Sequence, residues 1–266
     1  MEGQKPRQII HLDLDAFFCA VEEQLDPSLR GKPFAVGGRP ETRGVVASCS
    51  YAARKYGLRS AMPMAQALKL CPDLIIISHH HRAYSEKSRQ VMAILHDITP
   101  LVEQISIDEA FLDVSDLPEP AADIARRLQA RIRDELGLPS SLGVATNKLV
   151  AKIATNVGKA AAPEGVTPNA IRVVPPGAEA AFLAPLPMRM LWGVGPKTAA
   201  RLIELGIHTI GDIARAPTEL FEREFGKHGR DLAQRARGID NSPVTTAHEA
   251  KSISREVTFA HDVGDV

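Results

Sequence analysis

The sequence contains few cysteines and no long apolar run. Its three cysteines, Cys19, Cys49 and Cys71, have no C-x-x-C spacing, and their odd number argues against a disulfide framework. No uninterrupted apolar segment is long enough to span a bilayer. The N-terminal string MEGQKPRQII also lacks the apolar stretch that follows the basic residues of a signal peptide. We therefore expect a cytoplasmic chain with no membrane partner.

The sequence also lacks an excess of either charge. Lysine and arginine together number 32, as do aspartate and glutamate, so the formal net charge is zero. A protein without a global positive field can bind nucleic acid only through local basic patches. The 266 residues are 44% hydrophobic, which is ordinary for a soluble globular protein and enough for two or three domains.

The first hundred residues alternate between strand and helix patterns. In QIIHLDLD, residues 8–15, Ile10, Leu12 and Leu14 share one side of the chain, which predicts a strand. The segment AFFCAVEEQ then has a helical pattern. Beyond it we predict a hairpin at 33–37 and 43–48, short helices near 50–56 and 63–71, a buried strand at 74–78 and a helix at 82–97.

The string ISIDEAFLDV, residues 105–114, predicts a hairpin with two carboxylates at its tip. The apolar residues before Asp108 and those after Glu109 have opposite parity, so the inward face changes between them. The resulting β-α-β-β-α-β order is that of a ferredoxin-like α+β domain, here with an α/β insertion after the first helix. Its last pieces are a helix at 121–136 ended by Gly137, a strand at 141–146 and a helix from Asn147.

The composition changes after about residue 165. PNAIRVVPPG is turn-rich and predicts a linker, and short helical patterns follow as far as Arg237. We expect residues 243–251 to form an exposed tether. The alternating string SISREVTF after it predicts a strand, which we interpret as the start of a further domain.

Three carboxylates are predicted to converge. Asp13 ends the first strand, Asp108 and Glu109 lie at the hairpin tip, and the first and third strands of a ferredoxin-like sheet are neighbours. Such a set of hard oxygen ligands suits divalent cations, and two ions about 4 Å apart would support phosphoryl transfer. The alternative is a solvated turn beside an ordinary strand-end aspartate, which an Asp-Glu pair taken alone favours.

Two further strings suggest ligand binding. WGVGPKTAARL, residues 192–202, has the Gly-x-Gly-then-helix form of a helix-hairpin-helix, in which backbone amides bind DNA phosphates. It is not a Walker A loop, and a plain helical packing unit is the open alternative. The string His79-His80-His81 favours a solvated loop over a metal site, because adjacent residues cannot all face one ion.

Several strings together resemble the Y-family of translesion DNA polymerases, in particular its DNA polymerase IV (DinB-like) branch. HLDLDAFFCAVEEQ and SIDEAFLDV resemble the two metal motifs of that family. SYAARKYGLRSAMP resembles the fingers motif, GVATNKLVAKIAT the palm helix and LWGVGPKTAARLIELGI the thumb. The resemblance covers nearly the whole chain in order. It implies a catalytic core that lacks most of the C-terminal little-finger domain.

The resemblance implies a catalytic role for the three carboxylates. Asp13 and Asp108 would bind two Mg²⁺ ions, which Mn²⁺ could replace, and Glu109 would complete the metal site as the catalytic carboxylate. Leu14 would contribute its backbone carbonyl. Asp15 also matches the motif, but we expect it to support the site rather than to bind a metal.

The resemblance also implies a nucleotide site. Phe18 would be the steric gate whose ring excludes a ribose 2′-hydroxyl, with Phe17 beside it; periodicity alone favours a core phenylalanine. The loop after Lys159 runs AAAPEG and is longer than the family's Lys-Pro-x-Gly, which leaves the reach of Lys159 open. The triphosphate would be held by Ser48, Tyr51, Arg54 and Lys159, each of which could equally be a surface polar residue.

The implied architecture is a ferredoxin-like palm with a small α/β fingers insert and an all-α thumb. We predict the palm at 1–18 and 79–168, the fingers at 19–78, the thumb at 169–242, and the tether with the start of a little finger at 243–266. DNA would be bound by Trp192, Gly193, Val194, Gly195 and Lys197 of the thumb.

The predicted function is low-fidelity, template-directed DNA synthesis by a monomer that binds primer-template DNA and a dNTP. A sliding clamp would be a further partner of a full-length form. Two alternatives remain open. One is another palm enzyme such as a nucleotidyl cyclase, which leaves the helix-hairpin-helix unexplained. The other is a catalytically weak relative that recruits partners to DNA, in which we would expect the metal carboxylates to be lost.

Overall fold

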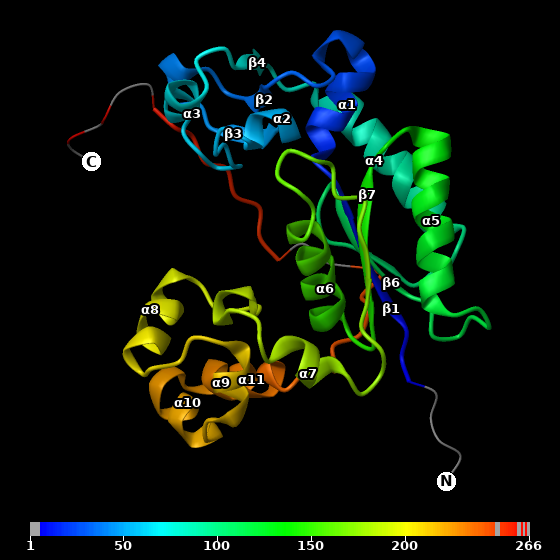
Figure 1. The fold of residues 1–266 in the computed structure, drawn as a ribbon, viewed down its shortest axis with the longest axis vertical. Helices are drawn as coiled ribbons and strands as arrows, with labels where there is room; N and C mark the ends of the chain where they lie inside the picture. The colour runs from blue at the N-terminus through cyan, green and yellow to red at the C-terminus, as the bar shows by residue number, and fades with distance from the viewer. Residues whose placement is uncertain (1–5, 248–250, 260–261, 263, 265–266) are drawn as a thin grey trace.

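The computed structural model describes residues 6–247, 251–259, 262 and 264. Figure 1 shows three parts: a sheet flanked by helices on the right, a small α/β unit at the top, and a group of short helices at the lower left. We refer to these parts as the palm, the fingers and the thumb. Among the described residues, no helix combines the length and apolar character needed to cross a membrane.

The palm is a five-stranded sheet in the order β5-β6-β1-β7-β8. Both neighbours of the central strand run antiparallel to it, which confirms the predicted ferredoxin-like arrangement. The predicted hairpin forms, but its first strand precedes the string 105–114: residues 105–108 make the turn, Ile105 is exposed, and Glu109 already belongs to the second strand. The edge strand β8 pairs parallel with β7. The strands are β1 (Ile9–Leu14), β5 (Val102–Gln104), β6 (Glu109–Asp113), β7 (Ser140–Ala145) and β8 (Ile171–Val173).

The linker prediction was wrong at β8. The strand is only three residues long, too short to show alternation, and the segment PNAIRVVPPG is dominated by turn residues. It extends the sheet because Leu142 donates a hydrogen bond to the carbonyl of Ala170 at 2.8 Å, and Val174 donates one to Val144 at 2.8 Å. Residues placed in the thumb by sequence thus pair with the palm sheet.

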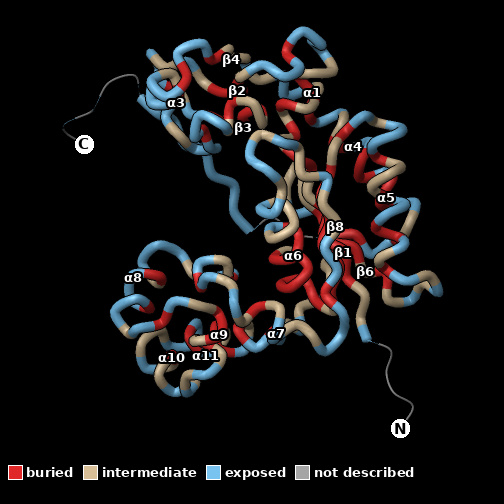
Figure 2. Tube along the Cα trace, in the orientation of Figure 1, coloured by how far each residue is buried: buried red, intermediate tan, exposed pale blue. Residues whose placement is uncertain are grey.

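Helices cover both faces of the palm sheet. Ile10, Leu12 and Leu14 pack on one side with α4 and α5, whereas Ile9 and Phe111 pack on the other side with α6. Strand β1 is therefore buried on both faces (Figure 2), and its odd-numbered residues point toward α6. The helices are α1 (Phe17–Leu25), α4 (His81–His96), α5 (Ala121–Leu136) and α6 (Lys148–Ala160), with a 3₁₀ turn at Pro27–Leu29.

The fingers contain a three-stranded sheet in the order β3-β2-β4. The predicted hairpin is confirmed, since β2 and β3 pair antiparallel. The strand predicted as buried, β4, is a half-buried edge strand parallel to β2, because helices cover only part of this small sheet. The elements are β2 (Phe34–Gly37), β3 (Val46–Cys49), β4 (Ile75–Ile77), α2 (Tyr51–Arg54), α3 (Met64–Leu70) and a 3₁₀ turn at Pro40–Thr42.

The thumb consists of short helices around an apolar core. Leu202, Ile210, Ile213, Phe221 and Leu232 are fully buried in it. The helices are α7 (Glu179–Leu183), α8 (Pro196–Glu204), α9 (Ile210–Arg215), α10 (Thr218–Phe225) and α11 (Lys227–Ala236), with a 3₁₀ turn at Met188–Met190.

The segment after the thumb returns to the palm. Asp240 accepts a hydrogen bond from the backbone of Leu149 at 3.1 Å, and Thr245 donates one to Glu103 at 2.7 Å, so the predicted tether is docked at its start. The strand predicted from SISREVTF does not form: residues 251–259 are exposed and have no helix or strand, since no strand among the described residues pairs with them. Residues 248–250 and most of 260–266 lie outside the described residues.

Candidate active site

The strand ends carrying the acidic residues meet at one edge of the palm sheet. Asp13 on β1 lies directly opposite Glu109 on β6 in the antiparallel register. The amide of Leu14 donates a 3.0 Å hydrogen bond to the carbonyl of Asp108, which fixes the hairpin tip against the end of β1. Asp13, Leu14 and Asp108 border one cavity of about 210 Å³. The predicted convergence of the two motifs is therefore present.

Helix α6 supplies cations to these carboxylates. Lys159 Nζ lies 2.5 Å from Oδ1 of Asp13 and 3.2 Å from Oδ1 of Asp15. Lys152 Nζ, two turns earlier on the same helix face, lies 2.5 Å from Oε1 of Glu109. As a result the Glu109 carboxylate is directed toward Lys152. Asp108 is instead bound by a hydroxyl, since Ser106 Oγ donates to its Oδ1 at 2.6 Å.

The two facing carboxylates have opposite proton affinities. Burial raises the pKa of Asp13 to about 6, because the nearby Glu109 and Asp108 charges add to burial and Lys159 only partly opposes it. Burial alone would raise the pKa of Glu109 too, but contacts with His11 and Lys152 lower it to about 2. Burial by itself lowers the pKa of Lys159, yet Asp13 and Asp15 outweigh that effect and raise it.

A buried histidine lies beneath Glu109. His11 is fully buried on β1, its Nδ1 is 2.9 Å from Thr155 Oγ1 of α6, and its Nε2 is 3.5 Å from Glu109 Oε1. Burial lowers the pKa of His11, and among the described residues its Nε2 has no hydrogen-bond partner. We therefore assign the larger share of the low pKa of Glu109 to the cation of Lys152.

The donor chemistry fits a divalent cation. Asp13 and Asp108 offer hard oxygens to the cavity, and Leu14 lies at its wall. Burial, with the nearby Glu109 and Asp108 charges, raises the pKa of Asp13, and a bound cation would oppose that effect. Within the part of the chain that the structure describes, no three His, Cys, Asp or Glu side chains are gathered as a ligand set. Glu109 in particular would have to turn from Lys152 to join the other two.

Asp15 has a structural environment. It is fully buried and accepts hydrogen bonds from Ser141 Oγ at 2.8 Å and from the amide of Asn169 at 3.1 Å. Together with Lys159, these donors satisfy the carboxylate and hold the segment after α6. The supporting role of Asp15 in the site stays a prediction.

The start of α1 brings two phenylalanines to the same cavity. Ala16 has a left-handed backbone (φ 46°), which turns the chain from β1 directly into the helix. Phe17 is almost fully buried, whereas Phe18 is half-buried and stacks on Tyr84 with ring centroids 4.3 Å apart. The Tyr84 hydroxyl donates to Glu22, which also binds His80 Nδ1 at 2.9 Å. The contact of Tyr84 with this ring was not predicted from the sequence.

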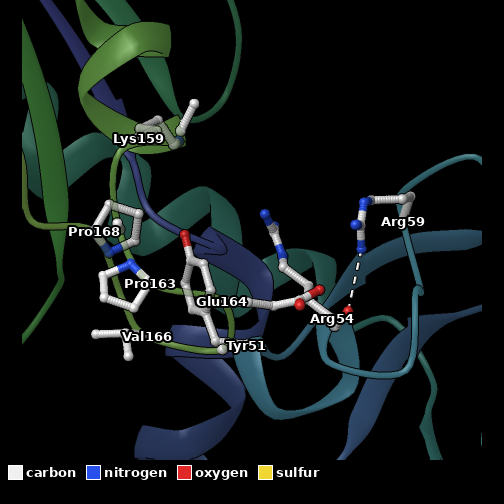
Figure 3. A pocket seen from close by; sticks show the side chains of 11 residues that line it. Tyr51, Arg54, Arg59, Lys159, Pro163, Glu164, Val166 and Pro168 are labelled. Atoms are coloured by element: carbon white, nitrogen blue, oxygen red, sulfur yellow. Dashed lines mark hydrogen bonds between the residues drawn. The ribbon is translucent and has the colours of Figure 1, made fainter.

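A second cavity of about 360 Å³ adjoins the first and has a basic wall (Figure 3). Tyr51, Arg54, Arg59 and Lys159 line it, and the Arg54 guanidinium lies 4.6 Å above the Tyr51 ring. Arg54 and Lys159 border both cavities, and Ser48 lines the first. The predicted nucleotide residues are thus brought together. Arg59, which lies within the fingers string, was missed.

The thumb string has the predicted helix start. Gly193 has φ 101° and Gly195 is the N-cap of α8, with Lys197 exposed on its first turn. Trp192 is 45% exposed and borders a small cavity with residues of α6, while Val194 packs against the thumb core. Their contacts with DNA stay a prediction.

The three consecutive histidines contact one another and Glu22. His79 and His81 stack with ring centroids 4.9 Å apart, and His80 binds Glu22. Over the described residues, no metal-binding group includes them.

Sequence comparisons place this geometry in a known family. The sequence model of the impB/mucB/samB family matches residues 12–156, and that of the DNA polymerase-iota thumb domain matches residues 189–240. The chain is 46% identical over 260 residues to DNA polymerase IV of Ralstonia nicotianae, covering 97% of this chain and 71% of that protein. It is 44% identical over 259 residues to DNA polymerase IV of Dehalococcoides mccartyi, covering 96% of this chain and 64% of that protein.

Solved structures agree. DinB from Sulfolobus solfataricus matches with a TM-score of 0.80 at 32% identity, over 90% of this chain and 69% of that one. The insertion ternary complex of Dbh DNA polymerase matches with a TM-score of 0.80 at 33% identity, over 89% of this chain and 69% of that one. The chain therefore belongs to the impB/mucB/samB family of Y-family DNA polymerases, in its DNA polymerase IV (DinB) branch.

Proposed function

We propose that the chain is the catalytic core of a template-directed translesion DNA polymerase. The primer 3′-hydroxyl attacks the α-phosphate of a dNTP, and pyrophosphate leaves. The observation that carries the proposal is the junction of two cavities, one bordered by Asp13 and Asp108 and the other by Arg54 and Arg59. An acidic and a basic chamber side by side suit a cation-bound polyphosphate.

Asp13, Asp108, Glu109 and the carbonyl of Leu14 would hold two Mg²⁺ ions, which Mn²⁺ can replace. When bound, such ions stabilise the attacking and leaving oxygens of an in-line phosphoryl transfer. The protein would contribute by holding these carboxylate and carbonyl oxygens together at one edge of the palm sheet. The register of β1 and β6 fixes Asp13 opposite Glu109, and the Leu14–Asp108 backbone hydrogen bond fixes the hairpin tip.

The basic cavity would bind the triphosphate. Arg54 offers a planar fork for phosphate oxygens, and its position above Tyr51 limits its motion. Ser48 and Lys159 complete the predicted set, with Lys159 shared between Asp13 and the cavity wall. Phe18, with Phe17 behind it, would lie against the sugar and leave no room for a 2′-hydroxyl.

The remaining partners are assigned by the same proposal. Trp192, Gly193, Val194, Gly195 and Lys197 would contact the phosphate backbone of primer-template DNA. We propose a cytoplasmic monomer, with a sliding clamp as a partner of a longer form. The palm, fingers and thumb limits predicted above are kept, except that β8 joins the palm sheet.

Primer extension on an undamaged template with Mg²⁺ tests the proposal. Wild type should add the templated dNTP, and Asp108→Ala should lose at least about a thousandfold, the scale of a missing catalytic group. Asp116→Ala is a matched control, since Asp116 is an exposed aspartate away from both cavities. If wild type binds the DNA but extends no primer at low salt, the chain is a recruitment relative and the polymerase assignment is wrong.

A further inference from the structure

The loop between α6 and β8 is attached to the active site at both ends. At its start, the amide of Ala162 donates to the carbonyl of Lys159 at 3.3 Å. At its end, Asn169 donates its amide to Asp15 at 3.1 Å, and Ala170 donates to Ser141 Oγ at 3.1 Å. Lys159 and Asp15 are themselves ion-paired, so the loop begins and ends on one charge cluster.

The tip of this loop touches the fingers. Residues 163–166 form a turn closed by a 3.1 Å hydrogen bond from Val166 to Pro163, and Gly165 at its third position has φ 78°. The side-chain stem of Lys55, which follows α2, lies so close that a β-carbon on Gly165 would be 2.0 Å from its Cε. The turn therefore rests on the fingers and bridges them to the palm.

This placement puts a carboxylate in the basic cavity. Glu164 lines the cavity with Tyr51, Arg54, Arg59 and Lys159, and in Figure 3 its carboxylate is directed toward Arg54. Glu164 is exposed, and it forms no ion pair within the described part of the chain. Its charge is thus held near the arginines by the loop backbone and not by a salt bridge.

The Glu164 carboxylate matters because few charged groups of the cavity wall are available to attract an anion. Lys159 is already bound to Asp13 and Asp15, which leaves Arg54 and Arg59 as the cations of the wall that are free of acidic partners among the described residues. A fixed negative charge beside two cations weakens the attraction for any anion that enters. The effect applies to a triphosphate and to pyrophosphate alike.

We propose that Glu164 sets the polyphosphate affinity of this subsite by competing with the bound anion for Arg54 and Arg59. It weakens dNTP binding and speeds the departure of pyrophosphate. Affinity shared by substrate and transition state does not accelerate chemistry, whereas slow product release can limit turnover. The inference rests on the proposed polymerase function and adds to it a residue that determines nucleotide affinity.

Steady-state primer extension with Glu164→Gln tests the inference. The KM for dNTP and the inhibition constant of added pyrophosphate should both fall about threefold to fivefold, the size expected for one partly exposed charge pair. Glu164→Lys should lower both constants further. The differences should shrink as salt rises from 50 to 500 mM, because screening weakens exposed charges. Glu86→Gln, the same change at an exposed position on α4, should alter neither constant.

Titration calorimetry of inorganic pyrophosphate with Mg²⁺ separates this inference from the proposed function. Tighter pyrophosphate binding by Glu164→Gln than by wild type supports the role of Glu164 even if no primer is extended. Equal pyrophosphate affinity, or a higher KM in the variant, overturns the role of Glu164 even if wild type proves to be an active polymerase. A gain in kcat at constant KM and constant inhibition by pyrophosphate would overturn it as well.

Discussion

Lys159 and Asp13 form an ion pair at 2.5 Å across the interface between α6 and β1, with the lysine side chain 22% exposed and the aspartate 16% exposed. The same ammonium group lies 3.2 Å from the buried Asp15. One cation therefore neutralises two acidic residues at the end of β1. Its removal would leave both carboxylates without a cationic partner.

We expect Lys159→Met to destabilise the protein by about 3 kcal/mol, the lower end of the range for breaking a buried pair, because the lysine is partly exposed. Urea unfolding would measure this loss. Lys159→Arg keeps the positive charge and should lose no more than about half as much, so equal losses in the two variants would show that packing and not charge is responsible.

Phe18→Ala should relax the selection of the sugar. The half-buried ring stacks on Tyr84 and lines the first cavity, so its removal would enlarge the space in which we propose that the sugar binds. The ratio of kcat/KM for dNTP to that for the matching rNTP should drop about 10- to 100-fold, the usual range for one lost pocket contact.

Tyr84→Leu provides a test of the stack itself. It leaves Phe18 in the chain but removes the ring behind it, so discrimination should fall by less than in Phe18→Ala. If Tyr84→Leu discriminates as well as wild type, the stacking partner does not position the ring.

Gly143→Ala should be among the most damaging single changes in the palm. A β-carbon on Gly143 would lie 2.0 Å from the carbonyl oxygen of Ala151 and 2.7 Å from Thr155 N, both backbone atoms of α6. We expect a loss of about 3 kcal/mol, the upper end for overpacking, because a whole helix has to move. Thermal unfolding compared with Gly195→Ala, whose β-carbon would meet open space, checks this: the control should lose no more than about 1 kcal/mol.

The cysteines should be unreactive in the folded protein. Cys19, Cys49 and Cys71 are at most 2% exposed, and burial raises the pKa of each, that of Cys19 to about 12. A thiol reagent at pH 8 should label none of them in native protein and all three in urea. Rapid labelling of one native thiol would contradict the packing of that residue.

The raised pKa of Cys19 also makes the free energy of unfolding depend on pH. The folded state holds this proton more tightly than the unfolded state, so its contribution to the free energy of unfolding is complete below the usual thiol pKa. That contribution is lost as the pH rises toward 12. A Cys19→Ala variant should therefore show a shallower decline in stability above pH 9 than wild type.

Sequence patterns predicted the palm well because its elements are long or strictly alternating. The parity change around Asp108 predicted a hairpin turn there, although the turn spans residues 105–108 and Glu109 already belongs to β6. The left-handed Gly137 (φ 65°) ends α5 as predicted. The strand β8 was missed because three residues carry no periodicity and its pairing with β7 is a tertiary contact. For the same reason β4 was taken as buried, although its burial depends on which helices cover the sheet.

The convergence of the carboxylates was predicted from the sequence, but the side chains that contact them were not. Lys152 and Thr155 lie on the same face of α6 as Lys159, a signal that helical spacing could have given. His11 shares the parity of Asp13 on β1, which could have marked it as part of the same face. The pairing of Lys159 with Asp13 could not have been found, because it depends on the distance between a helix and a strand that are 146 residues apart.

Three side chains of one helix, α6, contact the end of the sheet: Lys152 contacts Glu109, Thr155 contacts His11, and Lys159 contacts Asp13. Lys152, Thr155 and Lys159 follow at intervals of three and four residues, so they point the same way from a single helix. A one-residue insertion or deletion within α6 upstream of Lys152 would turn all three by about 100°. A movement of the helix backbone therefore cannot shift one of these three side chains without shifting the other two. The protonation of both Asp13 and Glu109 therefore depends on the position of α6. A rotation or sliding of this helix over Gly143 would change the protonation of both carboxylates at once.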